Sequence, residues 1–257
     1  MHSSINVIAA VGLAFGGAGL LMLVSLPGAV RAGPLEDAEA ATRRDDYATA
    51  IPIYRSLAEK GDVSAQKRLG FLYENGVGVK RDWVESANWF SKAADGGDES
   101  AVFVLSFLGR HWRDGGSASA PPIIYELVEK VAKSGFAIAQ FSLGVMYYPI
   151  GDPSFDTAKG DIAEALVWYR RAAEQGDVNA EIALGKAYAE GIGVVQDNIE
   201  ADKWYNIAAS QAKSADELAD IATHHNKLAH TMTSSQIAEA QKLAREWKPK
   251  TERQFSR

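Results

Sequence analysis

Two stretches of the chain, residues 61–82 and 176–197, share one pattern of amino acids. The first is GDVSAQKRLGFLYENGVGVKRD and the second is GDVNAEIALGKAYAEGIGVVQD. Their opening glycine recurs at Gly61, Gly97, Gly135 and Gly176, and each is followed four residues later by Ala and eight residues later by Leu. These glycines are 36, 38 and 41 residues apart. Intervals of this length are typical of repeat proteins, in which each unit buries its apolar face only by stacking on its neighbours.

Each unit predicts two helices joined by a tight turn. Apolar residues spaced by three or four positions predict the first helix, and a Gly-x-Gly sequence predicts its end. An Asp-x-x-Glu sequence then predicts a capping box at the start of the second helix. The residues that define the pattern are Gly61, Ala65, Leu69, Gly70, Tyr73, Gly76, Gly78 and Asp82 in the first clear copy, and Gly176, Ala180, Leu184, Gly185, Tyr188, Gly191, Gly193 and Asp197 in the second.

The second helix of three units contains a tryptophan followed, four residues later, by two alanines. These tryptophans are Trp89, Trp168 and Trp204, and a large ring opposite small residues indicates packing between neighbouring helices. We interpret the glycine of the Leu-Gly pair as a place where two helix backbones approach closely. Since a single helical hairpin cannot bury its own apolar face, the sequence predicts an all-α solenoid of stacked helix pairs.

The pattern GD-x-x-A-x-x-x-LG-x-x-Y-x-x-G-x-GV-x-x-D, followed by W-x-x-x-AA, resembles the Sel1-like repeat (SLR) family of the tetratricopeptide-like superfamily. The match is strong at 58–94 and 173–209, weaker at 97–134, where Ser106 replaces the glycine, and partial at 135–176. The resemblance implies a right-handed α/α solenoid of antiparallel helix pairs that acts as a scaffold for protein interactions. Family members associated with hydrolase activity are rich in cysteine, and this chain has none.

The N-terminal region has the features of an export signal. Residues 5–26 carry no charge, and Val30-Arg31-Ala32 fits a cleavage site, which would make Gly33 the new N-terminus. We therefore expect a signal peptide at 1–32, a repeat domain at 33–247 and a flexible tail at 248–257. The expected location is the periplasm or the exterior, and the alternative is an uncleaved anchor that holds the repeats on the periplasmic side.

Composition argues against several classes of function. The net charge of -6 argues against a nucleic-acid partner, which needs a basic surface, and the absence of cysteine excludes disulfides and thiolate sites. His224, His225 and His230 lack the i, i+4 spacing that would present two ligands to one metal. We therefore predict no enzyme activity, no cofactor, no metal and no membrane contact once the signal is removed. The alternative is a cell-envelope hydrolase or peptidoglycan-associated factor with its site in 110–122 or 148–160, two segments rich in Gly, Pro and Ser.

One face of the first helices gives a candidate site for a protein or peptide partner. The positions opposite the stacking stripe are apolar and aromatic in the two irregular units, and the resemblance implies that such positions line a concave surface. Two interpretations stay open: an apolar groove for a partner segment, or a face buried under the neighbouring loops. The candidate residues are Phe71, Phe103, Phe107, Arg110, Phe141, Val145 and Tyr148.

Overall fold

The computed structural model describes residues 33–111, 122–148 and 161–250, which contain twelve α-helices and no strand. The chain divides into two units, Met1–Gly33 and Pro34–Arg257, and all twelve helices belong to the second. Their bounds are α1 Pro34–Thr42, α2 Tyr47–Glu59, α3 Val63–Asn75, α4 Trp83–Asp95, α5 Glu99–His111, α6 Pro122–Lys133, α7 Ala137–Tyr147, α8 Ile162–Glu174, α9 Val178–Glu190, α10 Asn198–Gln211, α11 Ala215–Ala229 and α12 Ser234–Glu246.

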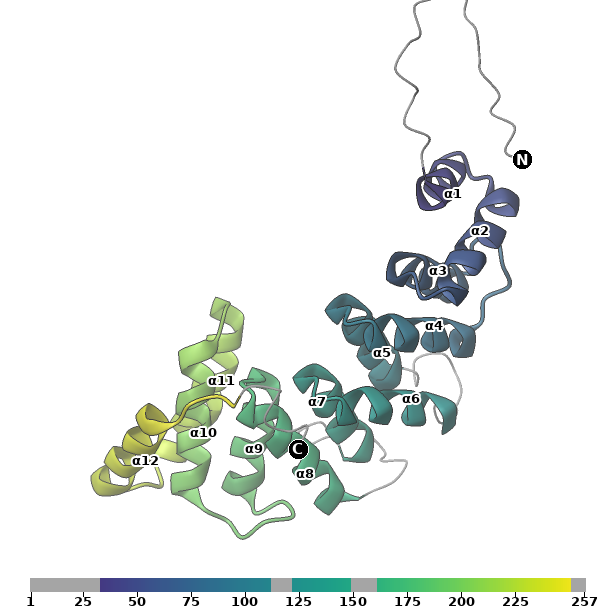
Figure 1. Cartoon of the computed structure of the whole chain (residues 1–257). Coiled ribbons are helices and arrows are strands. Elements are labelled where there is room, and N and C mark those ends of the chain that lie inside the picture. The colour runs from purple at the N-terminus through teal and green to yellow at the C-terminus, as the bar shows by residue number, and fades with distance from the viewer. Residues whose placement is uncertain (1–32, 112–121, 149–160, 251–257) are drawn as a thin grey trace, which may run out of the picture. The chain divides into compact units, whose positions relative to one another are not determined.

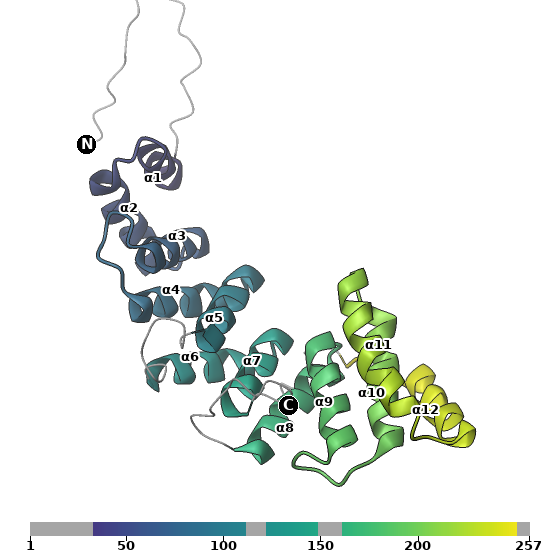
Figure 2. The same ribbon diagram turned by 180° about the vertical axis from the view of Figure 1, so that it is seen from behind.

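Helices that follow one another in the chain also pack against one another, from α1 through α11 (Figure 1). Contacts of α4 with α6 and of α5 with α7 join successive helix pairs, and Figure 2 shows the same order from behind. The segment 101–108, AVFVLSFL, is helical in α5, as the repeat register predicts against its strand-like composition. The predicted all-α solenoid of helix pairs is confirmed.

Aspartate caps begin most of the helices. The Asp82 carboxylate accepts from the backbone N–H groups of Val84 and Glu85, both at 3.0 Å. The prediction of reciprocal capping boxes at the aspartates needs correction, because Glu164 Oε1 instead accepts from the indole N–H of Trp168 at 2.9 Å. A complete box is present in α12, between Thr233 and Gln236. The other capping aspartates are Asp46, Asp62, Asp98, Asp161, Asp177 and Asp197.

The glycine of the Leu-Gly pair faces an aromatic ring, which corrects the predicted contact between two backbones. A Cβ atom at Gly185 would lie 2.5 Å from the ring of Tyr205, far inside contact distance. Gly70 meets the ring of Phe90 in the same way, at 2.8 Å. The rings come from the second helix of the same pair and are fully buried. The glycine therefore makes room for a large side chain, which no other residue could do at this position.

The irregular second unit changes both partners of this contact. Ser106 occupies the glycine position, and Val128 occupies the position of the buried ring. Both residues are buried, with 1% and 0% of their surface exposed. The residue on α5 is thus larger than glycine, and the residue on α6 is smaller than the aromatic ring of the clear copies.

The Gly-x-Gly turns place each pair on the pair before it. The second glycine has a positive φ in both clear copies, 68° at Gly78 and 67° at Gly193. A Cβ at Gly78 would lie 2.4 Å from Cβ of Tyr47 on α2, and one at Gly193 would lie 2.8 Å from Ile162 on α8. These glycines therefore serve both as turn residues and as points of close contact with the preceding second helix.

The C-terminal end closes onto the last clear repeat. Helix α12 packs on α10, and Trp247 contacts Trp204 edge to face with 6.3 Å between ring centroids. Lys250 donates its backbone N–H to the Glu174 carbonyl at 2.7 Å, and its ammonium group pairs with the Glu174 carboxylate at 2.7 Å. The prediction of a flexible tail from residue 248 therefore needs correction up to Lys250, because these contacts hold it against the end of α8.

Candidate partner-binding surface

Three phenylalanines on the first helices α3 and α5 are exposed to solvent. Phe71 is 42% exposed, Phe103 is 52% exposed and Phe107 is 41% exposed. Only three other large hydrophobic residues in the described part of the chain are exposed, Val167, Val195 and Leu218, and they lie on other elements. Exposed apolar area of this kind, gathered on one type of helix, is a common property of interaction surfaces.

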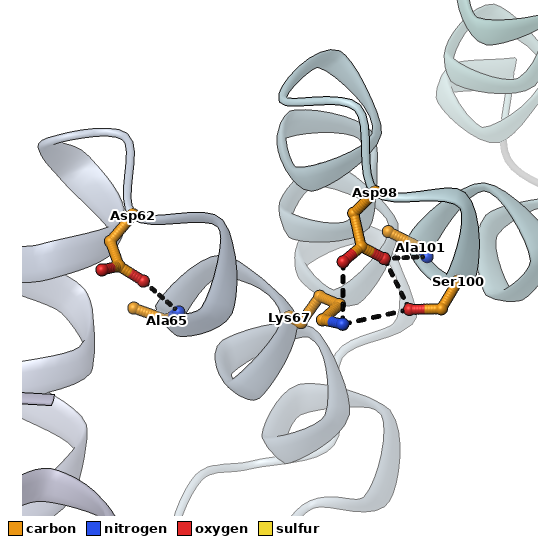
Figure 3. A network of polar contacts seen from close by, with 6 residues as sticks. All are labelled: Asp62, Ala65, Lys67, Asp98, Ser100 and Ala101. Atoms are coloured by element: carbon orange, nitrogen blue, oxygen red, sulfur yellow. Dashed lines mark hydrogen bonds and ion pairs between the residues drawn. The ribbon is translucent and has the colours of Figure 1, made fainter. Parts of the chain in front are cut away.

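An ion pair fixes α3 beside the start of α5 (Figure 3). The Lys67 ammonium on α3 lies 2.8 Å from Asp98 Oδ2 and donates to the Ser100 hydroxyl at 3.1 Å. One helical turn after Lys67 comes Phe71, and one turn after Ser100 comes Phe103. Because residues one turn apart share a helix face, each ring lies on the face of its own helix that carries this network.

Asp98 performs two tasks in this network, which Figure 3 shows together. Its Oδ1 caps α5 by accepting the backbone N–H of Ala101 at 2.9 Å, and its Oδ2 pairs with Lys67. Burial alone would raise the pKa of Asp98, but the hydrogen bonds from Lys67, Ser100 and Ala101 outweigh burial and lower it. Asp98 therefore stays ionised and holds the base of the aromatic surface in place.

Phe71 is braced from behind by the core. Its ring meets the buried ring of Phe90 edge to face, with 5.0 Å between centroids and 82° between planes. The carboxyl group of Glu74, one turn after Phe71 on α3, is also partly buried, and this burial raises its pKa. A supported ring can bind a partner at a lower cost in side-chain entropy than a free one.

The candidate residues on α7 lie in a different environment. Phe141, Val145 and Tyr148 are half-buried and pack against the core formed by α8, α9 and α10. The ring of Phe141 lies 5.8 Å from that of Tyr169, whose hydroxyl donates to the Tyr148 carbonyl at 2.8 Å. The candidate phenylalanines on α3 and α5 are thus exposed, whereas the candidate residues at α7 are partly buried against the core.

The remaining candidates, Arg110 and most of the two loop segments, fall on residues whose side chains the structure does not describe. Arg110 belongs to the last turn of α5, and the segments 112–121 and 149–160, which contain most of the alternative catalytic loops, are outside the described residues. Within the described ranges no group of three or more His, Cys, Asp or Glu residues is placed to hold a metal ion. The same ranges contain no helix with the length and hydrophobicity to span a bilayer.

The histidines of α11 have structural partners. His225 Nε2 lies 2.9 Å from Oδ1 of the buried Asp202, which joins α11 to α10. His224 stacks on the ring of Tyr205 with 6.0 Å between centroids. Burial lowers the pKa of His224. Both histidines thus connect α11 to α10.

The sequence did not predict an open groove of about 480 Å³ between α8 and the turn at 193–194. Arg170 and Arg171 line it, and both are already engaged. Arg170 donates to the Tyr188 hydroxyl at 2.5 Å, and the Arg171 guanidinium lies 4.7 Å from the Trp168 ring. The first clear copy has the same arginine–tyrosine bond, from Arg55 to Tyr73 at 2.6 Å. Its recurrence indicates a structural role in the repeat.

Capped helix pairs, ring-accommodating glycines and Gly-x-Gly turns define this chain as an α/α-solenoid repeat protein. The family model "Sel1 repeat" matches residues 63–98, 137–177 and 178–213. The chain therefore contains Sel1 repeats, and the resemblance seen in the sequence is confirmed. The model does not match most of the unit at 97–134, where Ser106 and Val128 replace the glycine and the ring.

Two relatives and one solved structure place the chain among known proteins. "Chitin synthase regulatory factor 3" of Schizosaccharomyces pombe is 27% identical over 208 residues, 65% of this chain and 22% of that protein. "DAP3-binding cell death enhancer 1" of Rattus norvegicus is 29% identical over 167 residues, 64% of this chain and 31% of that protein. The chain thus spans less than a third of either relative. A Sel1 repeat protein from Oxalobacter formigenes shares the fold, with a TM-score of 0.53, 24% identity and coverage of 82% of this chain and 64% of that one.

Proposed function

We propose that this protein is an exported, non-catalytic scaffold that binds a segment of another protein on the aromatic surface of α3 and α5. The observation that supports this most directly is the exposure of Phe71, Phe103 and Phe107 on helices whose opposite faces are buried. Aromatic side chains are enriched among the residues that dominate binding energy at protein interfaces. Sel1-repeat proteins generally mediate protein–protein interaction, and one relative is named for its binding to DAP3.

The chemistry of the surface favours an apolar partner segment. Three rings on α3 and α5 offer contact area and few hydrogen-bonding groups, and Lys67 and Asp98 form an ion pair with one another. A helix or extended peptide with two or three apolar side chains on one face fits such a surface. A strongly charged ligand would leave its charges without partners here and would lose hydration on binding.

Position-specific crosslinking tests the proposal. A photoreactive residue at Phe103 is expected to crosslink to a discrete protein in an extract of the source cell, and the same residue at Val195 is not. Val195 is a matched control because it is 88% exposed and lies outside the aromatic surface. Equal crosslinking at both positions would show that the surface has no special affinity and would remove the proposal.

Export is the second part of the proposal and rests on the uncharged segment at 5–26 and the cleavage pattern at 30–32. We expect the protein isolated from the source cell to begin at Gly33 and to fractionate outside the cytoplasm. N-terminal sequencing of the native protein measures this. An intact N-terminus in a membrane fraction would instead support the anchor, and an intact N-terminus in the cytoplasm would contradict export.

A further inference from the structure

A buried carboxylic acid occupies a repeat position where two other units have glutamine. Glu181 on α9 has none of its surface exposed. In repeat register it corresponds to Gln66 on α3 and Gln140 on α7, each four residues after the N-cap position of its helix. A fully buried glutamate is unusual without a cationic partner, since an ionised carboxylate loses its hydration there.

The two glutamines show what this position does. Gln66 Nε2 donates to the Ala58 carbonyl, and Gln140 Nε2 donates to the Ala132 carbonyl, both at 3.1 Å. Each acceptor lies eight residues earlier, in the last turn of the preceding helix. The side chain therefore ties the first helix of one pair to the second helix of the pair before it. An ionised glutamate has no hydrogen to donate and could not make this bond.

Glu181 reproduces the remaining contacts of Gln140. Gln211 Nε2 donates to Glu181 Oε1 at 2.7 Å, as Gln175 Nε2 donates to Gln140 Oε1 at 2.7 Å. The other carboxyl oxygen, Oε2, is buried and has no hydrogen-bond donor. By register its counterpart is the amide nitrogen of Gln140, and the equivalent acceptor is the carbonyl of Ala173, eight residues earlier at the end of α8.

We propose that Glu181 is protonated in the folded protein at neutral pH and donates its Oε2–H to the Ala173 carbonyl. The junction between α8 and α9 then depends on one bound proton. A protonated carboxylic acid has the same shape as the glutamine side chain and one hydrogen to donate, which is what this junction uses at the other two positions. Deprotonation leaves a buried negative charge against a carbonyl oxygen, which loosens the junction.

The charges around Glu181 support this assignment. Burial raises the pKa of Glu181 to about 8, the hydrogen bond from Gln211 lowers it, and the carboxylate of Asp177, the N-cap of α9, raises it. On the α10 side the facing group is the neutral Gln211, and α8 ends at Glu174, which is paired with Lys250. On α11 the titratable group near α9 is His224, which interacts with Lys186 and Glu190 further along α9. None of the described cations is paired with Glu181.

The sign of the pH effect follows from the two pKa values. The pKa of Glu181 is raised from 4.5 to about 8 in the folded state, so between these values the folded protein binds one proton more than the unfolded chain. The contribution of this group to stability is therefore complete below about pH 4.5 and is lost as the pH rises through about 8. The equilibrium constant for folding falls by up to about tenfold per pH unit within this window.

The test compares the protein with Glu181→Gln in urea unfolding from pH 5 to pH 9. The ratio of folding constants, variant over parent, is expected to rise towards tenfold per pH unit and to level off above about pH 8. A ratio that does not change with pH would overturn the proposal. A carbon-13 titration of the Glu181 carboxyl by NMR, assigned with the same variant, gives the folded pKa directly, and a midpoint below about 5 would also overturn it.

Gln140→Glu supplies a matched control at a position with the same bonds. It introduces a second acid with the same acceptor and the same glutamine donor, so the pH dependence of unfolding is expected to steepen beyond that of the parent. The double variant Gln140→Glu, Glu181→Gln is expected to return to the parent's slope. A double variant as insensitive to pH as Glu181→Gln alone would show that this repeat position does not couple protonation to stability.

Discussion

Gly185→Ser is expected to lower the free energy of unfolding by about 3 kcal/mol, the upper part of the usual range for overpacked cores. A Cβ at this position would lie 2.5 Å from the ring of Tyr205, which has only 2% of its surface exposed and is stacked on the ring of His224. The intrinsic preference of helices for serine over glycine, a few tenths of a kcal/mol, cannot offset such a clash. Urea denaturation followed by circular dichroism measures the change.

The irregular unit supplies the controls for this prediction. Tyr205→Val alone is expected to cost about 3 kcal/mol, because it leaves a cavity. Combined with Gly185→Ser it reproduces the Ser106–Val128 pair, so the double variant should lose clearly less than the sum of the two single losses. Ser106→Ala should change stability by less than about 1 kcal/mol, since no large ring occupies the corresponding place. Strict additivity would contradict a direct contact between ring and glycine.

Trp204→Ala is expected to lower the free energy of unfolding by about 4 kcal/mol, the typical cost of removing a buried tryptophan side chain. Trp204 is 5% exposed and is contacted edge to face by Trp247, so its loss also removes the support on which the end of α12 rests. Calorimetric melting measures the loss, and hydrogen exchange should show that α12 becomes less protected than α3.

Trp204→Phe is the matched control, because it keeps an aromatic ring against Trp247. It should lose less than half as much stability as the alanine variant. Equal losses in both variants would indicate that the indole group itself, with Lys203 lying 4.6 Å from the Trp204 ring, matters more than the packing of the aromatic pair.

The sequence predicted the repeated parts of this fold well, because they depend on residues close to one another in the chain. The apolar stripe, the Gly-x-Gly turn and the capping aspartate each act within a few residues, so their spacing defines the helix and its start. The register of these markers also assigned α5 correctly, although its composition resembles a strand. Local spacing was sufficient for helix type, helix order and fold class.

Contacts between helices were beyond the sequence pattern. The pattern located Gly185 but did not identify Tyr205 as its partner, because the two lie on different helices and nothing in their spacing shows that they meet. It also grouped Phe107 with Phe141, although one is exposed and the other packs beside Tyr169. Exposure depends on the neighbouring pair, and a single helical period does not show it.

The central claim, that the repeated residues form the frame and the aromatic surface of α3 and α5 binds the partner, is tested most directly by affinity. Calorimetric titration of the partner identified by crosslinking should show a 10- to 30-fold loss for Phe103→Ala, as expected for a central interface residue. Because Phe103 is 52% exposed, the melting temperature of the Phe103→Ala variant should stay within about 2 °C of the parent's. The control variant Val195→Ala should bind the partner with the parent's affinity. Unchanged affinity in the Phe103→Ala, Phe107→Ala double variant would contradict the account.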